Sequence, residues 1–159
     1  EAYALASRFL PILEEEARAH PANLDEFALA GLAFGLYADS LEAGLSREGR
    51  VLRGANCSVS VFMDSALVSS RQFGNCWVRP LPREEIIARL RPHAGRLQTV
   101  ALWCGDGREC VERALFAAGA VRITDGFHMS EGYCAMPRDG AYPLAKYMKR
   151  VSVARFSGV

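Results

Sequence analysis

The chain has 159 residues, of which 50% are hydrophobic, and a formal net charge of +1. This length can bury one sizeable core, so a single domain is the default expectation. The nearly balanced charge excludes the strong positive field that is typical of nucleic-acid-binding domains. No apolar run in the sequence approaches the ~20 residues of a membrane span, and no secretory signal is recognisable. We therefore expect a cytoplasmic protein.

Residues 1–45 predict two helices. In residues 1–20 apolar side chains recur at helical spacing, and Pro11 is expected to end or kink the helix. In residues 21–45, Asn23 is the expected N-cap. Such a helix pair cannot bury its apolar faces alone. Because the chain opens at Glu1, without methionine and inside a helical pattern, we expect it to be a piece of a longer polypeptide.

From residue 57 onward the pattern predicts strands and helices. Expected strands lie at 57–64, where valines alternate with serines, and at 75–81, 97–103 and 120–124, and expected helices at 82–92 and 105–119. The mostly apolar strand at 97–103 is expected to be buried on both faces, and Gly119 to cap the preceding helix. Residues 97–124 therefore predict a βαβ unit with parallel strands. The predicted fold class is α/β, with a mixed, partly parallel sheet flanked by helices.

The five cysteines show neither CxxC spacing nor a Cys/His pattern typical of zinc ligands: Cys57, Cys76, Cys104, Cys110 and Cys134. An odd count without such spacing argues against a disulfide framework and against a zinc site. We therefore expect reduced, buried thiols and no metal.

The turn at 104–108 contains Gly105 and Gly107 between a predicted strand and a predicted helix. It lacks the third glycine of a dinucleotide-binding loop and the Lys-Ser/Thr pair of a P-loop. Asp106 would also repel a phosphate group. A tight strand-to-helix turn is the simpler interpretation.

Two residues are candidates for catalysis, Cys57 and His128. A nucleophilic thiol needs a nearby base or a helix N-terminus to lower its pKa. Cys57 begins a predicted strand, so a buried structural thiol is the simpler interpretation. His128 follows the C-terminal end of a predicted strand, where the ligand-binding loops of parallel sheets gather. A loop residue without function is the alternative for His128.

Residues 137–155 predict a turn, a short helix and an alternating strand. The basic residues here outnumber the acidic ones: Arg138, Lys146, Lys149, Arg150 and Arg155 against Asp139. No aromatic stacking platform or basic stripe accompanies them. We interpret them as a solvated face and expect no nucleic-acid binding.

Three segments, taken in order, resemble the C-terminal part of the LuxC-type acyl-CoA reductases, which are long-chain fatty acyl-CoA reductases of the aldehyde dehydrogenase superfamily. Residues 97–102 are similar to the family's Leu-Gln-Thr-Val-Gly strand, and residues 117–129 to its Gly-Val-x-Arg-Ile stretch. Residues 138–152 resemble its closing segment. The matching positions are Gly119, Arg122, Ile123, Gly126, Met129, Asp139, Gly140, Leu144 and Val151, whereas Ala101, Arg150 and Ser152 depart from the family pattern.

This resemblance implies the catalytic lobe of the aldehyde-dehydrogenase fold without its nucleotide-binding lobe. In the family, a cysteine attacks an acyl thioester and NADPH then delivers hydride to release an aldehyde. The resemblance places the nucleophilic cysteine and the NADPH lobe outside this chain, in a missing N-terminal half or a partner subunit. The thioester would be an acyl-CoA or an acyl-carrier thioester. Residues Gly126, His128, Met129 and Asp139 would belong to a substrate or inter-lobe loop.

The resemblance also implies a division of the chain into a helical hairpin (1–49), an α/β core (50–136) and a C-terminal turn, helix and oligomerisation strand (137–159). Two alternatives stay open. The departures at Ala101, Arg150 and Ser152 favour a non-catalytic, LuxC-like dimerisation or docking module in a biosynthetic complex. The other alternative is a small cysteine enzyme that uses Cys57.

Overall fold

The computed structural model describes residues 1–46, 49–129, 131–132 and 136–137 of the chain. The chain forms two compact units, Glu1–Pro82 and Arg83–Val159. The described residues form helices together with parallel and antiparallel strand pairs, so the predicted α/β class is confirmed. The predicted division at residues 49 and 136 stays a prediction.

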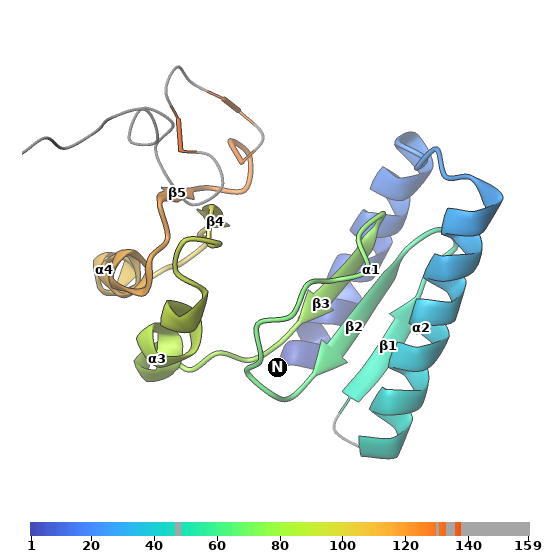
Figure 1. Ribbon diagram of the computed structural model, residues 1–159, viewed down its shortest axis with the longest axis horizontal. Helices are drawn as coiled ribbons and strands as arrows, with labels where there is room; N and C mark the ends of the chain where they lie inside the picture. Colours follow the sequence, from blue (N-terminus) through green and yellow to red (C-terminus); the bar gives the residue numbers. More distant parts are fainter. Residues whose placement is uncertain (47–48, 130, 133–135, 138–159) are drawn as a thin grey trace, which may run out of the picture. The chain divides into compact units, whose positions relative to one another are not determined.

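The first unit combines two helices with a three-stranded sheet (Figure 1). Its elements are α1 (Ala2–Ala19), α2 (Glu26–Ser46), β1 (Gly49–Arg53), β2 (Ser58–Phe62) and β3 (Asn75–Val78). Strand β2 lies in the middle, antiparallel to β1 and parallel to β3. The sheet is therefore mixed, as predicted, although the sequence pattern predicts no strand at β1.

Both helices differ from the sequence prediction, α1 at its expected end and α2 at its expected N-cap. Helix α1 does not end at Pro11, because residues on both sides of the proline, Ala6 and Leu13 among them, pack against the same hydrophobic core. The N-cap of α2 is Asp25 rather than Asn23. The Asp25 carboxylate accepts a hydrogen bond of 2.7 Å from the Ala28 backbone N–H, which satisfies one of the free donors of the first turn.

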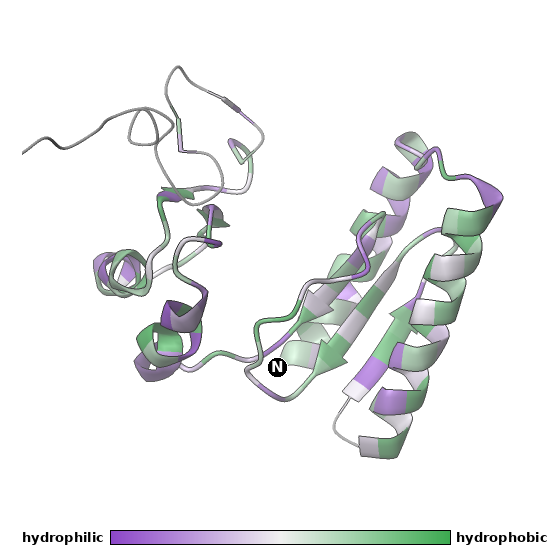
Figure 2. Cartoon of the chain, viewed as in Figure 1, coloured by the Kyte–Doolittle hydropathy of each residue, from purple (hydrophilic) through white to green (hydrophobic). Residues whose placement is uncertain are grey.

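Strand β2 is buried along its whole length, although its valines and serines alternate. Val59 and Val61 pack with Ala6 of α1 in the core of this unit. Ser58 and Ser60, on the opposite face, are also completely buried. Hydrophobic residues recur in β2 and in the flanking helices (Figure 2). The alternation therefore reflects two different buried surroundings rather than one buried and one solvated face.

The second unit contains the predicted βαβ arrangement. Its elements are a 3-10 turn η1 (Arg83–Glu85), α3 (Ile86–Leu90), a second 3-10 turn η2 (Arg91–His93), β4 (Thr99–Ala101), α4 (Arg108–Ala118) and β5 (Arg122–Thr124). Strands β4 and β5 are parallel, and Gly119 ends α4 with a φ of 105°, so both predictions are confirmed. The expectation that the β4 strand is buried on both faces is wrong, since Ala101 is exposed.

Helices α3 and α4 share the core of the second unit. Their buried side chains, together with the residue after α4, form one cluster: Ile86, Leu90, Val111, Leu115, Ala118 and Ala120. In helix α4 apolar residues recur at every third or fourth position, which places Val111, Leu115 and Ala118 on one face. This face of α4 therefore packs against α3.

Some of the predicted features lie outside the described residues. These are Cys134, Asp139 and the C-terminal helix and strand predicted within 138–155. No helix in the described part of the chain has the length and apolar character to cross a membrane.

Candidate functional site

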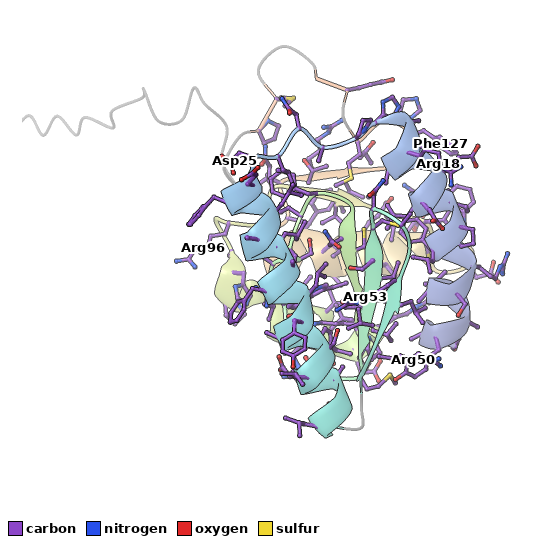
Figure 3. All side chains as sticks on the ribbon, turned by 90° about the vertical axis from the view of Figure 1, so that its right-hand side faces the viewer. Arg18, Asp25, Arg50, Arg53, Arg96 and Phe127 are labelled. Atoms are coloured by element: carbon purple, nitrogen blue, oxygen red, sulfur yellow. The ribbon has the colours of Figure 1, made fainter. Side chains whose placement is uncertain are left out.

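A cavity of about 500 Å³ lies in the first unit, where β1 ends and β2 and β3 begin. The end of α1, the first half of α2 and the turns that lead into β2 and β3 line it. Arg53, the last residue of β1, lies in the region framed by α1 and α2 (Figure 3). The cavity therefore brings together three stretches that are separated in the sequence, residues 17–36, 53–57 and 73–75.

The turn before β2 places Cys57 at the wall of this cavity. The Gly54 backbone N–H donates to the Cys57 carbonyl at 2.9 Å, and the Ala55 N–H donates to the Glu14 carboxylate at 3.0 Å. A Cβ atom on Gly54 would lie 2.7 Å from the Cys57 sulfur, so the turn requires a residue without a side chain here. Cys57 is buried, as the structural interpretation of the sequence expects.

The surroundings of Cys57 keep its thiol protonated. Burial raises the pKa of Cys57 above its ordinary value, and the negative charge of Glu14 raises it further. Burial also raises the pKa of the neighbouring Cys76. Backbone hydrogen bonds from Asn56 and Gly54 act on the pKa of Cys57 in the opposite direction, but burial and the Glu14 charge outweigh them. His20 also lines the cavity, but its imidazole lies 3.9 Å from Glu16, and among the described residues no hydrogen bond or ion pair joins it to Cys57. These environments are the reverse of those that activate a cysteine nucleophile.

The turn before β3 has an unusual backbone conformation. Gln72, Phe73 and Gly74 have φ angles of 64°, 46° and 78°, in the left-handed region that residues with a Cβ atom rarely adopt. The Asn75 side-chain amide donates to the carbonyls of Gln72 at 2.7 Å and Phe73 at 3.1 Å. Phe73 is half exposed and forms part of the cavity wall. Asn75 thus holds a strained turn against the cavity.

Asn75 is itself anchored in the sheet. Its side-chain oxygen accepts a hydrogen bond of 2.6 Å from the Ser58 hydroxyl, and both residues are buried. The Ser58 backbone N–H donates to the Gly74 carbonyl at 3.2 Å. Sequence reasoning does not identify Asn75, because a single Asn before a short strand is also typical of an ordinary turn.

His128, in the second unit, belongs to an ordered loop after β5. The Asp125 carboxylate accepts a hydrogen bond of 3.0 Å from the His128 backbone N–H and lies 2.7 Å from Nδ1 of the imidazole. The Arg122 guanidinium donates to the backbone carbonyls of His128, Met129 and Glu131 at 2.8–3.3 Å. Both the imidazole and the carboxylate are largely exposed. Sequence reasoning identifies His128 but not its partner Asp125. The spacing of three residues between the two is the sequence signal that could have identified the pair.

An exposed aromatic pair lies at the same edge of the β4–β5 sheet. The rings of Trp103 and Phe127 meet edge to face with centroids 6.5 Å apart, and 86% and 80% of these residues are exposed. Gly126 and Met129 belong to the same exposed loop. The carboxyl edge of these parallel strands therefore carries the loop expected from the sequence, and its function stays a prediction.

The pairing of Asp125 with His128 predicts a shifted titration. The hydrogen bond and charge of Asp125 raise the pKa of His128 above its ordinary value, and the same bond lowers the pKa of Asp125. The pairing therefore stabilises the loop below the unfolded pKa of about 6.5 and is lost as the pH rises through the higher folded pKa. NMR titration of the imidazole is expected to give a pKa above 6.5, and the Asp125→Asn variant a lower one. Equal values would contradict the pairing.

The glycine turn of the second unit is occupied by the chain's own side chain. The Arg83 guanidinium donates to the Asp106 carbonyl at 3.2 Å, and a Cβ atom on Gly107 would lie 2.8 Å from Arg83 Nη1. Gly107 has a φ of 77° and precedes α4. The region is therefore a tight turn that the Arg83 side chain fills.

No metal site is formed by the described residues, because no group of three or more of their His, Cys, Asp or Glu side chains could hold a metal ion.

Comparison with known proteins identifies one family. A sequence model of the family described as Acyl-CoA reductase (LuxC) matches residues 12–150. No curated protein and no solved structure matches the chain. The matched range covers most of both units, contains the first two segments that resemble the family, and extends to residue 150 within the third. The chain therefore belongs to the LuxC family of acyl-CoA reductases.

Proposed function

We propose that this chain is the C-terminal catalytic-lobe segment of an acyl-thioester reductase that forms an aldehyde with NADPH. The nucleophilic cysteine and the NADPH-binding lobe would be supplied outside this chain, by a further segment or a partner subunit. The family match over residues 12–150 is the observation that carries the proposal. An acyl-CoA is the first candidate for the thioester.

The environments of Cys57 and Cys76 support a nucleophile elsewhere. Thioester attack requires a thiolate that is accessible to the substrate. Cys57 is buried, and both Cys57 and Cys76 have raised pKa values, which favours the unreactive thiol. These features favour the proposal over the alternative of a small cysteine enzyme that uses Cys57.

The turn before α4 does not fit the pyrophosphate of NADPH. A dinucleotide loop presents backbone N–H groups and a glycine surface to the phosphates. Here the acidic Asp106 stands in the turn, and Arg83 fills the space beside Gly107 by binding the Asp106 carbonyl. We therefore assign no NADPH contact to this turn and derive no hydride step from this chain.

The 159-residue chain is expected to bind no NADPH on its own. Titration of the purified chain with NADPH in a calorimeter should give only heats of dilution, and a mixture with decanoyl-CoA should consume no NADPH. A known NADPH-binding reductase in the same buffer is the positive control. Tight NADPH binding, or NADPH consumption, by this chain alone would overturn the proposal.

A further inference from the structure

We propose that the cavity of the first unit binds the acyl chain of the thioester, and this inference rests on the proposed reductase function. The cavity has a volume of about 500 Å³, which is in the range of pockets that enclose a small-molecule ligand. Its lining contains no acidic side chain. The occupant that we assign is a linear aliphatic chain with a carbonyl at one end.

The wall that α2 contributes is aliphatic. Leu29, Leu32 and Leu36 follow one another at helical spacing and line the cavity together with Leu24, which precedes the helix. None of these leucines belongs to either hydrophobic core cluster of the described residues. Their apolar surface is therefore directed to the cavity, where an acyl chain would remove it from water.

Hydrogen-bond donors lie beside this wall, at the end of β1 and in the turn that follows. Arg53 Nη2 donates to the Leu36 carbonyl at 3.3 Å and to the Ser40 hydroxyl at 3.0 Å. Its Nε and Nη1 have no acceptor among the described residues, and Asn56, in the turn after β1, also lines the cavity. Arginine N–H groups and an amide suit a carbonyl oxygen. The cavity thus pairs an aliphatic side with a donor side, as a thioester requires.

An acyl chain fits this lining better than the nucleotide part of CoA. A nucleotide carries several phosphate charges and needs a cluster of basic residues or backbone N–H groups. The lining supplies Arg53 and His20 as its basic residues, and the rest consists mainly of leucine, alanine and other small or uncharged residues. The half-exposed Phe73 adds apolar surface at the edge.

The cavity is fixed in position by contacts behind it. The Asp39 carboxylate of α2 receives two hydrogen bonds from Arg71, at 2.6 Å and 3.1 Å, which tie α2 to the segment before β3. A Cβ atom on Gly35 would lie 3.1 Å from Arg71 Nε, so the glycine lets the guanidinium lie close to the helix. The leucine wall and the Phe73 turn are therefore held together by an ion pair whose carboxylate is buried.

Calorimetric titration of the full 159-residue chain tests the proposal. Decanoyl-CoA is expected to bind at least about tenfold more tightly than acetyl-CoA or free CoA, because only the long chain fills the aliphatic side. Equal affinities for all three would place recognition in the CoA moiety and overturn the proposal. Absence of decanoyl-CoA binding would also overturn it.

A matched pair of variants locates the binding site. Leu32→Trp places a larger side chain in the cavity and should weaken decanoyl-CoA binding about tenfold or more. Leu41→Trp makes the same change at an exposed position of α2 outside the lining and should leave the affinity unchanged. Arg53→Gln removes the guanidinium and its bonds to α2, and is expected to weaken binding as a second test. Thermal unfolding checks that all three variants are folded. Unchanged affinity in Leu32→Trp and Arg53→Gln would overturn the proposal.

The failure of this inference and that of the proposed function are separate results. NADPH binding by the chain alone would overturn the proposed division of the reductase without touching the acyl-CoA titrations. Loss of the difference between decanoyl-CoA and acetyl-CoA would overturn the acyl cavity while the NADPH result stands.

Discussion

Replacing Arg71 with leucine is expected to lower the free energy of unfolding of the first unit by about 3–4 kcal/mol, because it leaves a buried carboxylate without its cation. The Asp39 side chain is only 2% exposed, whereas that of Arg71 is 40% exposed. Arg71 donates from two nitrogens to the two Asp39 oxygens, which raises the pKa of the guanidinium. Loss of this pair also frees the segment that precedes β3.

The two partners are expected to respond unequally. Asp39→Asn should cost only about 1–2 kcal/mol, because the amide still accepts a hydrogen bond and the half-exposed Arg71 can reach water. Urea unfolding, together with amide hydrogen exchange of β2, measures the effect within the first unit. Glu16→Ala, which removes an exposed i,i+4 partner of His20, is the control and should change stability by less than about 0.5 kcal/mol. A larger cost for Asp39→Asn than for Arg71→Leu would contradict the assigned burial.

Local patterns predict the second unit better than the first. The βαβ segment and the Gly119 cap depend on hydrophobic periodicity and a glycine at a helix end, and both are sequence-local. The Asp39–Arg71 pair joins residues 32 positions apart, and neither residue stands out in the sequence. Pro11 does not end α1 for the same reason, since packing of α1 on β2 outweighs a local helix-breaking tendency.

The candidate site shows the same division. His128 is predictable from its place after a strand, and its partner Asp125 lies three residues away. The cavity, in contrast, is lined mainly by leucines, alanines and turn residues from three separated stretches of the chain, none of which forms a motif. It also lies where β2 and β3 begin, at the end opposite to the one where the rule for parallel sheets directs a search. Cys57 is the sequence candidate that lines this cavity in the structure, and it is buried. A cysteine in the sequence is therefore a poor guide to a catalytic site.

Replacing Asn75 with alanine is expected to cost about 2–3 kcal/mol and to weaken decanoyl-CoA binding. The change removes three hydrogen bonds and leaves the completely buried Ser58 hydroxyl without its acceptor. The turn residues Gln72 and Phe73 would then relax from positive φ, which residues with a Cβ atom disfavour, and Phe73 would leave the cavity wall. Urea unfolding and calorimetric titration measure the two effects.

Three further variants separate the anchor in the sheet from the hold on the turn. Ser58→Ala removes only the hydrogen bond from the Ser58 hydroxyl of β2 to the Asn75 side chain. It should cost about 1–2 kcal/mol, with little loss of decanoyl-CoA affinity. Asn75→Asp keeps an acceptor for Ser58 but cannot donate to the turn carbonyls, so it should lose affinity as Asn75→Ala does. Asn75→Gln, which keeps the amide on a longer side chain, should recover part of the affinity if the donors are what matter. If Asn75→Asp instead binds decanoyl-CoA as well as the unmodified chain, the amide does not hold Phe73 at the cavity, and the turn keeps its conformation by packing alone.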